Sequence, residues 1–242
     1  MAKNVIIGQS GGPTAVINSS LAGVYKAACS LGADKVYGMK YGIEGLLKEE
    51  LVELNVLLDD RLSIELLKRT PSSYLGSCRY KLPEPEADST PYVKLFTLFD
   101  KYDICALFYI GGNDSMDTGD KLSRCARIRR ESISFIGVPK TIDNDLPVTD
   151  HTPGYGSAAK YVASTVREIS LDASVYQQPA VTIVELMGRH AGWVTAAAAL
   201  ARKFPGDNPL LIYMPEVPFS MEQFFKDVEQ ALSRQPNVVI CV

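Results

Sequence analysis

Short apolar runs alternate along this chain with longer segments in which apolar residues recur every three to four positions. The short runs have the length of buried strands, and the longer segments have the periodicity of helices. Parallel strands covered by helices on both faces show this pattern. We therefore predict an α/β fold with a parallel sheet. The predicted strands are Val5–Ile7, Val36–Met39, Ile104–Ile110, Ile133–Val138, Val181–Leu186, Leu210–Met214 and Val238–Val242, and the predicted helices are Thr14–Ser30, Ser115–Arg129, Ser157–Ser170, Ala191–Arg202 and Met221–Ser233.

Two segments interrupt or end this alternation. Lys81–Pro91 is rich in proline and acidic residues, and we predict a loop rather than a domain linker because the alternation resumes after it. At the other end, Asn237–Val242 stops inside an apolar run, whereas natural termini are more often polar and exposed. We therefore expect the sequence to be one portion of a longer chain.

Composition narrows the class of protein and of partner. The 242 residues are 46% hydrophobic and 22% charged, which indicates a globular chain with a substantial core and excludes disorder as the main state. The formal net charge of -3 gives no general attraction to nucleic acid or to acidic membranes. We predict neither as a partner, and any bound anion must be held by a local site.

The cysteines and the hydropathy pattern suggest a location. The five cysteines are scattered, odd in number and without a CxxC pair, so we predict reduced, mostly buried thiols. Reduced thiols are typical of the cytoplasm, which we expect to be the location. Neither a signal peptide nor an apolar stretch near the ~20 residues of a membrane span is present.

Candidate chemistry lies in the loops after the strands, where open α/β sheets bind ligands. Gly8–Asn18 contains the pair Gly11-Gly12, and Gly111–Ser115 contains a second glycine pair. Glycine pairs at a helix N-terminus let backbone N–H groups approach an anion, although many such turns are only tight turns. The first loop matches neither a P-loop nor a dinucleotide motif. In the second loop, Ser115 is equally consistent with an ordinary N-cap.

The loop Gly137–Asp145 carries the clearest signal. Asp143 and Asp145 stand close to Lys140 and Thr141 at the end of a strand. A phosphoryl transfer uses such groups: one carboxylate accepts the proton of an attacking hydroxyl, another holds Mg²⁺, and the lysine neutralises phosphate oxygens. The alternative is an acidic turn after a strand.

A fourth loop, Glu185–Gly192, combines small residues with an arginine before an alanine-rich segment. The planar guanidinium of Arg189 suits bidentate contact with a phosphate. His190 could titrate, but a lone histidine at a helix start is more often a capping or packing residue.

Six motifs follow one another along the chain: Gln9-Ser10-Gly11-Gly12 with Asn18, Gly76-Ser77-Cys78-Arg79, Gly111-Gly112-Asn113-Asp114-Ser115, Pro139-Lys140-Thr141-Ile142-Asp143-Asn144-Asp145, Met187-Gly188-Arg189 and Pro215-Glu216-Val217. In their order and spacing they resemble those of the phosphofructokinase family, and the resemblance spans essentially the whole chain. It implies a Rossmann-like three-layer αβα parallel sheet, the phosphofructokinase fold, with part of a second similar domain. Residues 1–145 would bind the phosphoryl donor, and residues 146–242 would form part of the fructose 6-phosphate domain.

The chain is most similar to the pyrophosphate-dependent branch of that family. ATP-dependent members have glycine where this sequence has Asp114 and Lys140. A carboxylate at Asp114 would crowd and repel the nucleotide, whereas Lys140 offers positive charge to a small, highly charged pyrophosphate. The segment Thr149–Ser157 also resembles the pyrophosphate-using group.

The resemblance implies a role for each matching residue in Mg²⁺-dependent, reversible phosphoryl transfer from pyrophosphate to fructose 6-phosphate. Asp143 would be the general base, with Lys140 and Thr141 also catalytic, and Asp114 and Asp145 would be metal ligands. The donor would contact Gly11, Gly12, Arg79 and Lys140, and the sugar phosphate would contact Thr141, Asp143, Asp145, Met187, Gly188, Arg189 and Glu216.

The resemblance has two departures and leaves alternatives open. Asn113 stands where the family has a metal-binding aspartate, and Ala180 stands where many members have an arginine that reaches a neighbouring subunit. The family implies a homo-oligomer, a dimer or tetramer. An ATP-dependent enzyme of the same fold and a non-catalytic regulatory homologue are the alternatives, and the intact Lys140–Asp145 motif favours catalysis over the latter.

Overall fold

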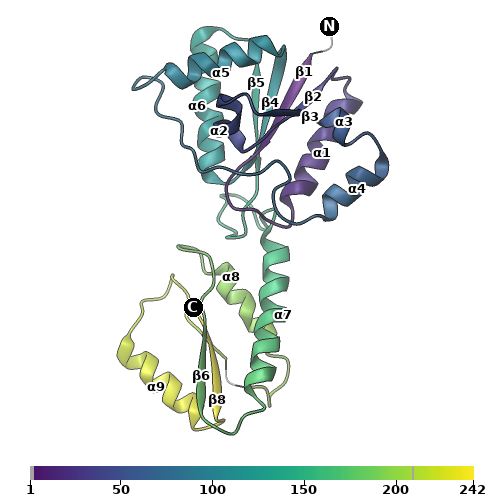
Figure 1. Ribbon diagram of the computed structural model, residues 1–242. Coiled ribbons are helices and arrows are strands. Elements are labelled where there is room, and N and C mark those ends of the chain that lie inside the picture. The colour runs from purple at the N-terminus through teal and green to yellow at the C-terminus, as the bar shows by residue number, and fades with distance from the viewer. Residues whose placement is uncertain (1–2, 209) are drawn as a thin grey trace. The chain divides into compact units, whose positions relative to one another are not determined.

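The computed structural model describes residues 3–208 and 210–242 and divides into two compact units, Met1–Thr141 and Ile142–Val242 (Figure 1). Each unit has its own sheet and its own covering helices. The sequence placed the boundary after residue 145, whereas the units divide between Thr141 and Ile142. Which ligand each domain binds stays a prediction.

The first unit is built on a five-stranded sheet in the order β3-β2-β1-β4-β5. All strand pairs are parallel except β2 with β3, and β1 lies in the middle, where Val5 pairs with both Val36 and Ala106. The elements of this unit are β1 (Asn4–Gln9), α1 (Ile17–Ser30), β2 (Val36–Met39), α2 (Gly42–Leu47), β3 (Leu51–Glu53), α3 (Leu54–Leu57), α4 (Arg61–Arg69), α5 (Thr90–Lys101), β4 (Ile104–Gly111), α6 (Asn113–Arg129) and β5 (Ser134–Pro139).

Helices cover both faces of this sheet, because successive strand residues point to opposite sides. Val5 and Ile7 of β1 pack with α1, α3 and α4, whereas Ile6 packs with α2, α5 and α6. Both clusters consist of residues that are almost completely buried, so each face has a core of its own. The result is the predicted three-layer α/β arrangement.

The second unit repeats this arrangement on a smaller scale, with a three-stranded parallel sheet in the order β6-β8-β7. Val239 and Cys241 of the central strand pack with the helices on one face, and Val238 and Ile240 pack with α9 on the other. Its elements are α7 (Tyr155–Ala173), β6 (Ala180–Val184), α8 (Trp193–Ala196), the 3₁₀ helix η1 (Ala197–Ala201), β7 (Leu210–Ile212), α9 (Met221–Leu232) and β8 (Asn237–Cys241).

The predicted fold class is confirmed, and the main difference concerns the predicted helix Ala191–Arg202. This segment is a single α-helical turn from Trp193 that continues as 3₁₀ helix. The helix starts late because residues 188–191 form a turn, in which the Ala191 N–H donates to the Gly188 carbonyl at 2.9 Å. No helix or strand is predicted from the sequence between Gly42 and Lys101, where the structure has four helices and one strand.

The remaining predictions concern cysteines and membranes. All five cysteines are free thiols, with three buried, Cys105 half-buried and Cys29 exposed. Across residues 3–208 and 210–242, no helix combines the length and the apolar character that crossing a membrane requires.

Candidate active-site loops

Three strands of the first unit end at one level, and their following loops carry the predicted donor-binding residues. Gln9 at the end of β1 pairs with Ile110, and Gly111 of β4 pairs with Pro139 at the end of β5. Because these strands are parallel, their carboxyl ends share one edge of the sheet. The glycine loop after β1, the start of α6 and Lys140 therefore lie at the same edge.

Lys140 is buried against the glycine loop, although lysine is normally exposed. Only 4% of the residue is accessible. Its backbone N–H donates to the Gly111 carbonyl at 3.0 Å, and its Nζ donates to the Gly12 carbonyl at 2.6 Å. The ammonium is thereby fixed beside the predicted donor-binding glycines.

Gly11 makes this placement possible. Its φ of +76° favours glycine, and a Cβ at this position would lie 3.2 Å from the Lys140 Nζ. Gly12 differs, because no atom lies within 4 Å of where its Cβ would be. The loop thus leaves open space above Gly12 and packs closely at Gly11, as a small anion site requires.

A buried polar network fixes the glycine loop. Gln9 donates to Asn18 Oδ1 at 2.9 Å and accepts hydrogen bonds from Ser73 Oγ and the Leu75 N–H. Asn18 also accepts from the Tyr74 N–H at 2.9 Å. The sequence motif contained Gln9 and Asn18 without a role for either. Amide side chains among buried apolar positions were the available signal, since buried polar groups need partners.

The same loop holds the segment that leads to Arg79. The Ser77 hydroxyl donates to the Gly11 carbonyl, and the Ser10 hydroxyl donates to the Cys78 carbonyl at 3.0 Å. Arg79 follows directly and is exposed. Arg79 therefore directly follows two residues that contact the glycine loop, and its exposed side chain is accessible to a ligand.

Asp114 lies in the first turn of α6, where a carboxylate is favoured by the helix dipole. It forms an ion pair with Lys81 at 2.9 Å, and both side chains are largely exposed. Sequence reasoning missed Lys81, which it placed in an acidic loop. The N-cap suggested for Ser115 is wrong, because α6 begins at Asn113, and Ser115 is buried against Gly111.

The acidic loop that begins the second unit is organised by Asn144. This residue is buried, has a φ of 57°, donates to the Asp150 carbonyl at 3.1 Å and accepts the Thr152 N–H at 2.9 Å. Asp143 on one side is half-buried, and Asp145 on the other is exposed. The asparagine thus holds the backbone from which both predicted functional carboxylates project. Thr141, half-buried, ends the first unit.

The predicted sugar-phosphate residues lie around a tight turn in the second unit. Gly188 has a φ of +126°, and a Cβ there would lie 2.4 Å from the Ala191 carbonyl oxygen. Met187 and Arg189, on either side of this glycine, are exposed, as is His190. The turn therefore presents the thioether and the guanidinium to the surroundings while glycine makes the bend.

Glu216 holds the end of this turn. Its Oε1 accepts the Gly192 N–H at 2.7 Å, and a Cβ on Gly192 would lie 2.5 Å from Oε2. A Cβ there would also lie 2.9 Å from the Met214 Cβ, so glycine favours this approach, and the carboxylate occupies the N-terminus of α8. Direct contact of Glu216 with a sugar phosphate stays a prediction.

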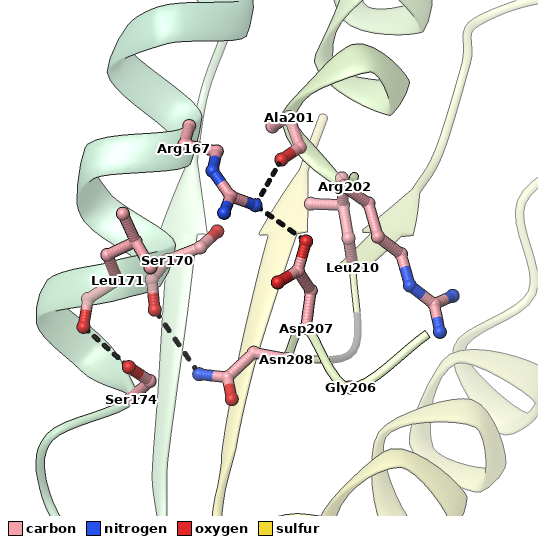
Figure 2. Close-up of a pocket in the computed structure, with 10 residues that line it drawn as sticks. All are labelled: Arg167, Ser170, Leu171, Ser174, Ala201, Arg202, Gly206, Asp207, Asn208 and Leu210. Atoms are coloured by element: carbon pink, nitrogen blue, oxygen red, sulfur yellow. Dashed lines mark hydrogen bonds and ion pairs between the residues drawn. The ribbon is translucent and has the colours of Figure 1, made fainter. Parts of the chain in front are cut away.

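A separate small cavity in the second unit is lined by residues from the end of α7 and by residues before and at the start of β7 (Figure 2). Its volume is about 80 Å³, and its ten lining residues include none of the predicted site residues. Arg167 donates to Asp207 at 2.6 Å and to the Ala201 carbonyl at 3.1 Å. The backbone N–H groups of Phe204 and Lys203, with Arg167, lower the pKa of Asp207 to about 2. The arginine is therefore committed to an ion pair that fixes the loop before β7.

Comparisons with known proteins all lead to one family. The family model for phosphofructokinase matches residues 4–242. The chain is 43% identical over 244 residues to a pyrophosphate--fructose 6-phosphate 1-phosphotransferase of Halomonas elongata, covering 99% of this chain and 58% of the relative. It is 45% identical over 233 residues to a protein of that name from Xanthomonas campestris, covering 96% of this chain and 55% of the relative.

The solved structures give the same result. A crystal structure described as a pyrophosphate-dependent phosphofructokinase from Nitrosospira multiformis matches with a TM-score of 0.90 and 39% identity, over 100% of this chain and 60% of that one. The chain thus spans little more than half the length of these relatives. With a family model that matches nearly the whole chain and a fold that agrees throughout, the chain belongs to the phosphofructokinase family.

Proposed function

We propose that the full-length protein transfers a phosphoryl group reversibly from pyrophosphate to the 1-hydroxyl of fructose 6-phosphate, giving fructose 1,6-bisphosphate and phosphate. The observation that carries this proposal is the buried ammonium of Lys140, held 2.6 Å from the Gly12 carbonyl. A fixed positive charge beside a glycine loop suits a small, highly charged donor. The names of the relatives at 43% and 45% identity support the same donor.

The donor side of the proposal uses residues of the first unit. Gly11 and Gly12 would let phosphate oxygens approach the backbone, Lys140 would neutralise them, and Arg79 would add a bidentate contact from its exposed position. Asp114 would exclude the larger nucleotide. Developing charge on the transferred group is stabilised best by donors that are already in place, which describes Lys140.

The acceptor side uses Thr141 and the second unit. Asp143 would take the proton from the sugar 1-hydroxyl, and Thr141 would contact the reacting end of the sugar phosphate. Met187, Gly188 and Arg189 would bind the sugar phosphate, for which the exposed guanidinium of Arg189 is suited. Asp145 and Glu216 would also contact the sugar phosphate.

Mg²⁺ fits the predicted site residues as an ion that is bound mainly by the phosphate groups of the substrate. In the part of the chain that the structure describes, no three acidic, histidine or cysteine side chains gather to hold a metal. Mg²⁺ commonly binds one or two carboxylates together with substrate phosphates and water. The exposed Asp145 suits this role better than Asp114, whose charge is paired with Lys81. When bound, Mg²⁺ would neutralise charge on the phosphate oxygens.

The proposal also covers location and assembly. We place the enzyme in the cytoplasm, because its five cysteines are all free thiols and phosphorylated sugars are intracellular metabolites. We further propose that it works as a homo-oligomer, a dimer or tetramer, on grounds of family membership.

Product analysis in both directions tests the proposal. The full-length protein is incubated with fructose 6-phosphate, pyrophosphate and Mg²⁺, and sugar bisphosphate and phosphate are quantified by ³¹P NMR. We expect both products in equal amounts, and re-formation of pyrophosphate when they are supplied instead. A protein that binds fructose 6-phosphate without forming product would be a regulatory homologue, and the proposal would be wrong.

A further inference from the structure

We propose that Lys81 is a donor-specificity residue that acts through Asp114. Its ammonium neutralises the Asp114 carboxylate, so that this side chain can obstruct a nucleotide by its volume without repelling pyrophosphate by its charge. The inference rests on the proposed pyrophosphate activity. It also changes the expectation that Asp114 selects the donor by repulsion.

The contact that motivates this inference joins two segments of the first unit. Lys81 Nζ lies 2.9 Å from Asp114 Oδ1, which is within ion-pairing distance. Asp114 lies in the first turn of α6, two residues after Gly112 and beside the edge of the sheet that carries Lys140. The pair therefore lies at the helix start that follows Gly111, whose carbonyl accepts the Lys140 backbone N–H at 3.0 Å.

The backbone on which Lys81 stands is fixed along α6. Leu82, the next residue, is buried, and its carbonyl accepts a hydrogen bond from Lys121 Nζ at 3.1 Å. Lys121 is itself nearly buried and pairs with Asp117 at 2.8 Å and with Glu84 at 3.1 Å. These ion pairs clamp the segment 82–84 to the helix, so Lys81 starts close to Asp114 before any ligand binds.

The ion pairs that Lys121 forms with Asp117 and Glu84 keep their charges over a wide pH range. The hydrogen bonds that Lys121 donates to Asp117 and to Glu84 raise the pKa of Lys121, and Lys121 with Arg124 lowers the pKa of Glu84. Both residues therefore remain charged at neutral pH, and the position of Leu82 does not depend on a titration near pH 7.

Pyrophosphate carries several negative charges, and an unpaired carboxylate beside it would oppose binding. A lysine in contact with that carboxylate offsets the repulsion, while the volume of the aspartate remains. The effect of removing Lys81 should therefore depend on whether residue 114 carries a charge. A lysine that only contacted pyrophosphate directly would show no such dependence.

A double-mutant cycle on the full-length protein tests this dependence. The Kd of pyrophosphate is measured by calorimetry for wild type, Lys81→Met, Asp114→Asn and the double variant, alongside the KM of each donor. We expect Lys81→Met to raise the Kd about fivefold in the wild-type background and less than about twofold with Asp114→Asn. Lys35→Met, which removes a charge from the Lys35–Glu53 pair, is the matched control. It should change neither the Kd of pyrophosphate nor the KM of either donor.

Equal losses in both backgrounds would show direct donor contact by Lys81, and no loss in either would show that Lys81 does not influence donor binding; each result overturns the inference. The KM for fructose 6-phosphate should stay constant throughout. If wild type turns over pyrophosphate and either of these results is found, the inference about Lys81 is wrong and the proposed function stands. Absence of pyrophosphate turnover and binding in wild type would refute the proposed function.

Discussion

Lys140 Nζ donates to the carbonyl oxygen of Gly12 across 128 positions of sequence, at 2.6 Å. The two residues follow β5 and β1, which are separated in the sheet by β4. This contact ties together the ends of three strands and holds a positive charge at one edge. A fixed charge of this kind is what a local polyanion site in a mildly acidic protein would need.

Replacing Lys140 by methionine tests the role of this charge. Methionine keeps much of the side-chain length and removes the ammonium, so the Gly12 carbonyl loses its donor and the anion loses its partner. We expect kcat/KM for pyrophosphate to fall about 100-fold, since loss of a buried charged partner costs roughly 2–5 kcal/mol. Steady-state kinetics measures this change, and fructose 6-phosphate should bind with unchanged Kd. A loss below about threefold would contradict the role of Lys140.

Gly11→Ala should disturb the same contact through the backbone. Alanine at a φ of +76° is strained, and its Cβ would lie 3.2 Å from the Lys140 ammonium. We expect destabilisation of about 1–2 kcal/mol, seen without ligand as a lower Tm by roughly 2–8 °C.

The matched control for Gly11→Ala is Gly23→Ala. Gly23 lies within α1, has no atom within 4 Å of a new Cβ and is exposed. Alanine there should raise the Tm slightly, because glycine in a helix interior is unfavourable by about 0.5–1 kcal/mol. Similar shifts for the two variants would mean that the close packing at Gly11 does not matter.

Asp143→Asn separates catalysis from binding. The amide has nearly the volume of the carboxylate but cannot accept the proton of the sugar hydroxyl. We expect turnover to fall by a factor of about 10² to 10⁴, while the Kd of fructose 6-phosphate changes little. Calorimetry and the rate of product formation give the two values. A variant with nearly normal rates would refute the assignment of the general base.

Asp207, which accepts the backbone N–H groups of Phe204 and Lys203 and pairs with Arg167, predicts a dependence of stability on acid. The pKa of Asp207 in the folded protein is about 2, below its ordinary value of 3.8, so this carboxylate stabilises the folded state above pH ~4. That contribution is lost as the pH falls from about 4 to 2. The Tm difference between wild type and Asp207→Asn should therefore narrow as the pH falls below about 4. Asp172→Asn, at an exposed position on α7, should show no comparable trend.

The sequence predicted the sheet and the glycine loops well, because their signals are local. Apolar runs such as Ile104–Ile110 predicted buried strands, and the resemblance of the motif around Lys140 assigned that residue to the donor. The contact between Lys140 and Gly12 was not predictable from either segment alone. It depends on the order of strands in the sheet, which brings distant positions to one edge.

Two other features needed the three-dimensional structure. Lys81 lies in a loop that composition describes only as rich in proline and acidic residues. Its ion pair with Asp114 depends on the fold, which holds the neighbouring Leu82 against Lys121 of α6. Likewise, the position of Glu216 against Gly192 depends on a close approach between segments 24 residues apart. The spacing of apolar residues along the sequence does not indicate such an approach.

The ratio of kcat/KM for pyrophosphate to kcat/KM for ATP, measured on the full-length protein with fructose 6-phosphate and Mg²⁺, tests the central claim most directly. The buried charge of Lys140 and the obstruction at Asp114 predict rapid turnover with pyrophosphate and a ratio of at least about 100. Turnover with ATP alone would contradict the assignment of the phosphoryl donor.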